Sequence, residues 1–168
     1  TLQIAQALYE KHKLTTYPRT DSKFLPEDYV STVKKTLGML KGSLEPFTEQ
    51  VLKNNWVKKN PKIFDNKKIS DHHAIIPTGN APKSLTEAEQ KIYNMICQRF
   101  IAVFFPPAQY LNTERITTIE GETFLTEGKI LVDPGFLTVY GKEAKQEGDL
   151  PKLANNKAKN IELESIED

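Results

Sequence analysis

The stretch TTYPRTDS, at positions 15–22, places a phenol and a guanidinium two residues apart among polar side chains. Proline fixes its own φ and disfavours the helical region for the residue before it, so Pro18 predicts that Tyr17 lies in extended chain. Side chains two residues apart in extended chain point to the same side, which would group Tyr17 with Arg19 and could add Asp21. The pattern alone leaves two interpretations open: a Tyr-Pro turn with a surface arginine, or a site.

As a site, the pair of Tyr17 and Arg19 would suit chemistry at a phosphate. Arginine presents a planar fork of donors that matches phosphate oxygens, and tyrosine can act as a covalent nucleophile. A tyrosine with an ordinary pKa of about 10 is only roughly 0.1–1 % ionised near neutral pH. Nearby positive charge would therefore have to favour its anion.

The stretch SDHHAIIPT, at positions 70–78, contains two of the three histidines. Adjacent side chains point in different directions, so at most one of His72 and His73 faces a given ligand. One interpretation is a metal site, since Asp71 and the histidines resemble the signature of the DHH phosphoesterases, which needs further acids. The others are a packed loop with a structural histidine, and a histidine that contacts a phosphate or moves a proton. The upstream acids, which form no convincing cluster, are Asp21, Asp28 and Asp65.

The elements that must position these stretches are mostly helical. Apolar residues at helical spacing, a proline followed by acids, and a Thr-x-x-Glu capping box all indicate helices in the first two thirds of the chain. A long irregular segment interrupted by prolines separates the last two of them, and such segments are usually functional or disordered. The expected helices cover 2–12, 26–39, 46–54 and 86–105, and the irregular segment covers 55–83.

The amino-acid composition changes after the double proline at 106–107. Residues 115–133 are rich in Thr, Ile, Val and Phe around a Glu-Gly-Glu interruption, which predicts two strands and a tight turn. Further short strands are expected at 136–141 and 161–166. The predicted fold class is therefore α+β, with a mainly helical domain at 1–105 followed by part of an antiparallel β domain at 106–168.

The composition, 38 % hydrophobic and 27 % charged, is typical of a soluble globular protein, and no apolar run is long enough to span a membrane. The single cysteine, Cys97, excludes an internal disulfide and is predicted to be a buried thiol. The net charge of +1 hides an asymmetry. Residues 1–70 have 13 Lys or Arg against 7 Asp or Glu, whereas residues 71–168 have 10 against 15. The first part could attract a polyanion and the second would not.

The densest basic run, KNNWVKKNPKIFDNKK at 53–68, has six lysines and one aspartate. It is either a solvated loop or a platform on which single-stranded nucleic acid stacks, because aromatic rings among lysines suit that binding. The candidate DNA contacts within it are Lys58, Lys59 and Trp56.

Taken together, TTYPRTDS after a helix and SDHHAIIPT further along resemble the type IA DNA topoisomerases, and among these the bacterial topoisomerase III branch. The resemblance implies that Tyr17 attacks single-stranded DNA and forms a 5′-phosphotyrosine link, after which another strand passes and the break is resealed without ATP. It implies that Arg19 holds the scissile phosphate and that His72 is the active-site histidine. Supporting roles fall to Thr20, Asp21 and His73.

The resemblance also implies a winged-helix-like fold for 1–105 and part of an arch domain for 106–168. The family's magnesium-binding Asp-x-Asp-x-Glu triplet does not occur in the sequence, so Mg2+ is expected to bind elsewhere in a longer parent, and no cofactor is expected here. The chain starts at Thr1 without an initiator methionine, and we expect a fragment that is inactive alone. Its expected partners are single-stranded DNA and the remaining domains of the parent. Its expected location is the bacterial cytoplasm, with the nucleoid.

Two other functions remain open at this point. One is a non-catalytic DNA-binding module with a winged-helix core and a basic loop. The other is a metal phosphoesterase centred on Asp71, His72 and His73, which metal analysis of the purified protein would separate from the first two.

Overall fold

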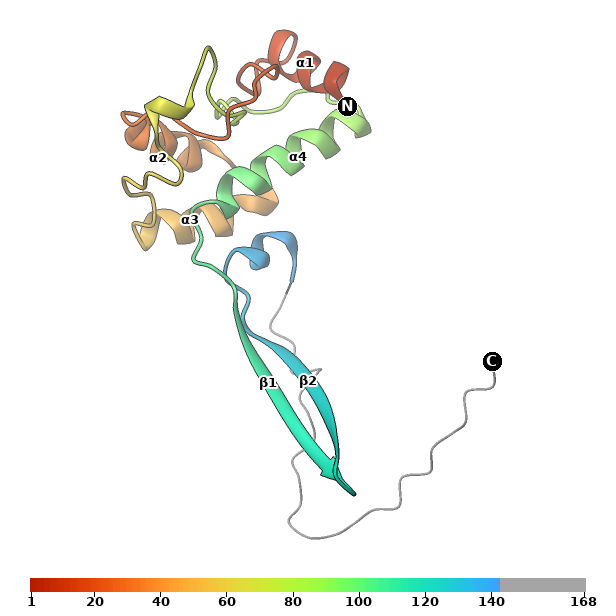
Figure 1. Cartoon of the computed structure of the whole chain (residues 1–168). Coiled ribbons are helices and arrows are strands. Elements are labelled where there is room, and N and C mark those ends of the chain that lie inside the picture. The colour runs from red at the N-terminus through yellow and green to blue at the C-terminus, as the bar shows by residue number, and fades with distance from the viewer. Residues whose placement is uncertain (143–168) are drawn as a thin grey trace.

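Four α-helices form the body of the protein in the computed structural model, which describes residues 1–142 (Figure 1). A β-hairpin extends away from this body, so the described part combines helices with an antiparallel sheet, and the predicted α+β class is confirmed. The winged-helix likeness stays a prediction. Within 1–142, no helix has the length and apolar character that crossing a membrane requires. The helices are α1 Leu2–Glu10, α2 Val30–Met39, α3 Glu45–Lys53 and α4 Glu87–Ala102.

The helix α2 begins later than the proline at 26 predicts. Pro26 opens a single turn, closed by the Tyr29 N–H bonding to the Pro26 carbonyl at 3.0 Å. The regular helix starts only at Val30, when the Val33 N–H reaches the Tyr29 carbonyl at 2.8 Å. The predicted start is therefore wrong by one turn, because proline pre-sets a turn as readily as a helix.

The start of α4 is the one that its capping box predicts. The Thr86 hydroxyl accepts a hydrogen bond from the Glu89 N–H at 3.3 Å, and the Glu89 carboxylate accepts one from the Thr86 N–H at 2.8 Å. The same carboxylate lies 3.0 Å from Nε2 of His12, just beyond the end of α1. Hydrogen bonds from Thr86 and His12 hold the pKa of Glu89 at about 2. This cluster ties α1 to α4.

The core lies between the helices, where α1 packs on α4 and α2 packs on α3. Cys97 faces this core, and the predicted buried thiol is confirmed. Its burial raises the pKa of the thiol to about 11, so it stays protonated at neutral pH. The fully buried aliphatic side chains are Leu8, Leu14, Val33, Leu37, Val51, Val57 and Ile101.

The two strands and tight turn predicted within 115–133 are confirmed as a hairpin of β1 Gln109–Ile119 and β2 Glu122–Asp133, although the first strand begins earlier than expected. Its two turn residues, Glu120 and Gly121, have φ of 51° and 89°, the positive angles of a type I′ hairpin turn. The strands pair only with each other within the described residues, so both outer edges are open.

The predicted strand at 136–141 is wrong: residues Gly135–Tyr140 form a 3-10 helix. Gly135, at φ 47°, turns the chain back so closely that a Cβ would lie 2.5 Å from the Pro106 carbonyl oxygen. Val139 is then buried, and its carbonyl accepts a hydrogen bond from Nε2 of Gln98 in α4 at 3.2 Å. A strand here would need a neighbouring strand to pair with, whereas this segment packs against the helix α4. The expected strand at 161–166 lies outside the described residues.

Candidate active site

The two motifs of the sequence lie side by side, although residues 23–69 separate them in the chain. The Thr16 N–H donates to the Ile76 carbonyl at 2.9 Å, and the Thr78 N–H donates to the Leu14 carbonyl at 3.0 Å. These bonds form a short antiparallel contact at the base of both motifs. The Tyr-Pro-Arg segment and the histidine pair are therefore held next to each other by the backbone.

The ring of Tyr17 packs between two aromatic neighbours. Its centroid is 4.2 Å from that of His72, with the planes tilted by 38°, and 5.4 Å from that of Tyr9 in an edge-on contact. Tyr17 is half-buried, whereas His72 is exposed. The phenol therefore has its imidazole neighbour on the solvent side, where a substrate could reach both.

The second histidine points elsewhere. The His73 ring packs against Tyr29 at 5.0 Å between centroids, and its Nδ1 lies 2.7 Å from the Ala74 carbonyl oxygen, to which it donates. A carbonyl can only accept, so this bond places the proton on Nδ1. The two adjacent imidazoles thus have different surroundings: His72 faces Tyr17 and His73 faces the protein.

Arg19 is held by a helix that the sequence did not link to it. Its Nη2 donates to Oε1 of Gln6 at 3.1 Å, and Nε2 of Gln6 donates to Oε1 of Glu10 at 2.9 Å. The helical spacing of Gln6 and Glu10 signals that those two share a face of α1, but nothing local signals Arg19. Gln6 and Tyr9 are the neighbours of the site that sequence reasoning missed.

An open hollow of about 460 Å³ brings most of the candidate residues together. Tyr17 is not among the residues that line the hollow, but its ring packs against the ring of His72, which does line it. An anion in the hollow would meet a guanidinium and an imidazole and would also pass two carboxylates. The lining residues are Arg19, Thr20, Asp21, Ser70, Asp71 and His72.

The described residues do not fit a metal site. Across 1–142, no group of three or more His, Cys, Asp or Glu side chains is placed to hold a metal ion. The histidine next to Asp71 and His72 turns toward Tyr29 instead. The metal phosphoesterase interpretation and a magnesium site on these residues therefore have no set of ligands here.

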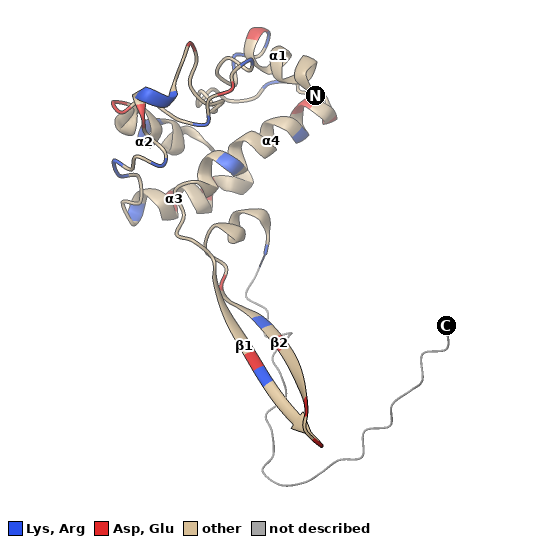
Figure 2. Cartoon of the chain, viewed as in Figure 1, with Lys and Arg blue, Asp and Glu red and all other residues tan. Residues whose placement is uncertain are grey.

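No residue of the basic run at 53–68 lines the hollow. The lysines of this run gather at the end of the body where α2 and α3 lie (Figure 2). Trp56 is half-buried and packs edge-on against Phe105 at 4.9 Å, so its ring forms part of the rim of the core. Lys58 and Lys59 are exposed. Of the three candidates, the two lysines remain accessible to a polyanion.

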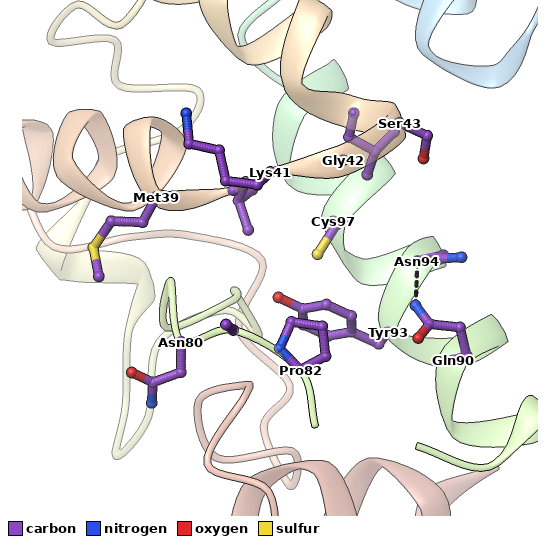
Figure 3. A pocket seen from close by; sticks show the side chains of 13 residues that line it. Met39, Lys41, Gly42, Ser43, Asn80, Pro82, Gln90, Tyr93, Asn94 and Cys97 are labelled. Carbon is purple, nitrogen blue, oxygen red and sulfur yellow. Dashed lines mark hydrogen bonds between the residues drawn. The ribbon is translucent and has the colours of Figure 1, made fainter. Parts of the chain in front are cut away.

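A second cavity, of about 320 Å³, lies on another part of the surface between the end of α2, the loop at 80–82 and α4 (Figure 3). Tyr93 and Cys97 face it, and burial raises the pKa of the Tyr93 phenol above its ordinary value. No candidate residue of either motif lines this cavity. It is therefore separate from the Tyr17 site.

Comparison with known proteins defines the class. The family model for DNA topoisomerase matches residues 1–168, and the chain belongs to this family. Within it, the predicted likeness to the type IA, bacterial topoisomerase III branch is confirmed.

The similar curated proteins are each named DNA topoisomerase 3. The chain is 43 % identical over 165 residues to the protein of Bacillus licheniformis, and the match covers 92 % of this chain and 22 % of that relative. It is 42 % identical over 157 residues to that of Bacillus subtilis, covering 89 % and 21 %. It is 41 % identical over 143 residues to one from Bacillus cereus, covering 83 % and 20 %. The chain thus spans about a fifth of the length of these relatives.

Proposed function

We propose that this chain carries the DNA-cleaving tyrosine of a type IA topoisomerase, an enzyme that changes DNA topology by cutting one strand, passing another and resealing the cut. The observation that carries the proposal is the contact of Tyr17 with His72, at 4.2 Å between ring centroids, beside the hollow that contains Arg19. A phosphate in the hollow would meet Arg19 and His72, and Tyr17 packs directly against His72.

In the cleavage step, the Tyr17 oxygen attacks the phosphorus of a backbone diester. The bond from the tyrosine oxygen to phosphorus forms, the bond from phosphorus to the 3′ oxygen breaks, and the phenolic proton is released while the 3′ oxygen gains one. One of the five guanidinium N–H donors of Arg19 goes to Gln6, and others can hold the phosphate oxygens. A protonated His72 would add a further donor to the charge that develops there.

Resealing is the reverse step, in which the 3′ hydroxyl attacks the phosphotyrosine. One phosphate ester bond forms and one breaks in each direction, so the diester's free energy is conserved and no ATP is needed. The substrate is proposed to be single-stranded DNA, as the family resemblance implies, and its backbone would meet the Arg19 and His72 side chains that line the open hollow.

The remaining parts of a longer parent are proposed to complete the enzyme. The hairpin supports this, because it exposes apolar side chains, and a two-stranded ribbon is marginally stable at best alone. We propose that magnesium is bound by such other parts, that this chain alone is inactive, and that the parent acts on the nucleoid in the bacterial cytoplasm. The exposed apolar side chains of the hairpin are Tyr110, Leu111, Ile116, Ile119, Phe124, Leu125 and Val132.

The test is covalent capture of DNA by the longer parent protein, using an oligonucleotide labelled on the 3′ side of the cleavage point. The wild type should retain the label after denaturation, and Tyr17→Phe should bind the oligonucleotide equally but retain none. This substitution keeps the ring that packs on His72 and removes only the hydroxyl. A phenylalanine variant that still captured DNA would place the nucleophile elsewhere.

A further inference from the structure

The contact between the two motifs departs from a regular ladder at the residue before Tyr17. In a regular antiparallel ladder, the Ile76 N–H would donate to the backbone carbonyl of Thr16. It donates instead to the Thr16 side-chain oxygen at 2.9 Å. The same hydroxyl donates to the Ala74 carbonyl at 3.3 Å. A side chain thus replaces the backbone where the two segments begin to separate.

A second hydroxyl, that of Thr20, also joins the two segments. Oγ1 of Thr20 donates to the His72 carbonyl at 2.8 Å and accepts from the Ser22 N–H at 3.1 Å. Along the first segment Tyr17 lies between Thr16 and Thr20, and on the second segment His72 is the residue whose carbonyl Thr20 bonds. The rings of Tyr17 and His72, one from each segment, lie 4.2 Å apart between centroids.

We propose that Thr16 and Thr20 are positioning residues that set the spacing at which the Tyr17 and His72 rings pack together. Each hydroxyl both donates and accepts. Thr16 joins its own segment to the Ala74 carbonyl and the Ile76 N–H, and Thr20 links the His72 carbonyl to the Ser22 N–H. Serine can make the same two bonds, whereas valine has the shape of threonine and makes neither. The ring contact is a property of this chain, and its effect on cleavage rests on the proposed function.

The chain supplies a matched control at the adjacent position. Thr15 is 2 % exposed, and its hydroxyl oxygen is buried without a hydrogen-bond partner among the described residues. Thr15→Val should therefore leave the site and the fold intact, since no bond is lost. The same substitution at Thr16 removes two hydrogen bonds.

The experiment on the 168-residue chain measures the chemical shifts of the His72 ring protons, which lie against the Tyr17 ring and feel its ring current. Thr16→Val and Thr20→Val should move these shifts toward those of Tyr17→Ala. Thr16→Ser and Thr15→Val should keep them. Thr20 links to His72 from outside the core, so Thr20→Val provides the measurement if Thr16→Val fails to fold. Wild-type His72 shifts in a folded valine variant at either position would overturn the proposal for that residue.

In the longer parent, the same variants separate positioning from a general loss of stability. A misplacement of about 1 Å can cost about 100-fold in rate. Thr16→Val and Thr20→Val should therefore slow covalent capture by about 10- to 100-fold at unchanged DNA affinity, with serine restoring the rate. Wild-type capture rates in both valine variants would overturn the catalytic part. Capture of DNA by Tyr17→Phe would instead contradict the proposed function, while the result for the His72 ring protons would remain valid.

Discussion

Replacing each of the two adjacent histidines by alanine should produce opposite effects, because their neighbours differ. His72 packs on Tyr17 and lines the hollow, whereas His73 packs on Tyr29 and bonds the Ala74 carbonyl. In the proposed enzyme only His72 reaches the phosphate. The two variants remove the same imidazole from neighbouring positions, so each is the control for the other.

The expected loss for His72→Ala is in rate. Removing one donor that stabilises transition-state charge costs about 10²- to 10³-fold, so cleavage by the longer parent should slow by about that factor. Its effect on folding should be small, since the side chain is exposed. Single-turnover cleavage of a labelled oligonucleotide measures the first quantity, and the melting temperature of the 168-residue chain measures the second.

The expected loss for His73→Ala is in stability. Its hydrogen bond to a carbonyl contributes about 1 kcal/mol, and its edge-on contact with Tyr29 about 0.5–1.5 kcal/mol. For a domain of this size, 1 kcal/mol corresponds to about 2–4 °C, so the melting temperature should fall by roughly 3–10 °C. Cleavage below the melting temperature should stay near that of the wild type. If His73→Ala were the slow enzyme and His72→Ala cleaved normally, the assignment of the pair would be reversed.

Three further outcomes are expected. Gln6→Ala should free Arg19 and weaken covalent capture of DNA severalfold in the parent. Gln6→Glu is the comparison, because it keeps an acceptor for the arginine. Equal capture by the alanine variant and the wild type would show that α1 does not hold the arginine. The pKa of Glu89 is about 2 against an ordinary 4.5, so its stabilising effect is complete above about pH 4.5 and is lost as pH falls toward 2. Glu89→Gln should remove this part of the acid dependence in melting curves, and an unchanged pH profile would contradict it. Charge reversal at Lys58 and Lys59 should weaken single-stranded DNA binding and reduce its salt dependence; no change in either would leave 53–68 as an ordinary solvated loop.

Local signals in the sequence were enough for several elements. The capping box at Thr86 sets the start of α4, and the glycine after Glu120 sets the hairpin turn, because the groups that make each bond are neighbours in the chain. Pro18 keeps the Tyr17 segment out of a helix for the same local reason. Family resemblance also came from local motifs, which the family match and the relatives confirmed.

Only the tertiary structure decided how distant segments meet. Residues 136–141 have the composition of a strand, but they form a 3-10 helix because α4 is the surface available to bury Val139. The packing of Trp56 on Phe105 and the bond from Gln6 to Arg19 join side chains whose encounter no periodicity encodes. Sequence reasoning from the residues required that the two adjacent histidines differ. Which of them contacts Tyr17 depends on the hydrogen bonds that join the two motifs across more than fifty residues of chain.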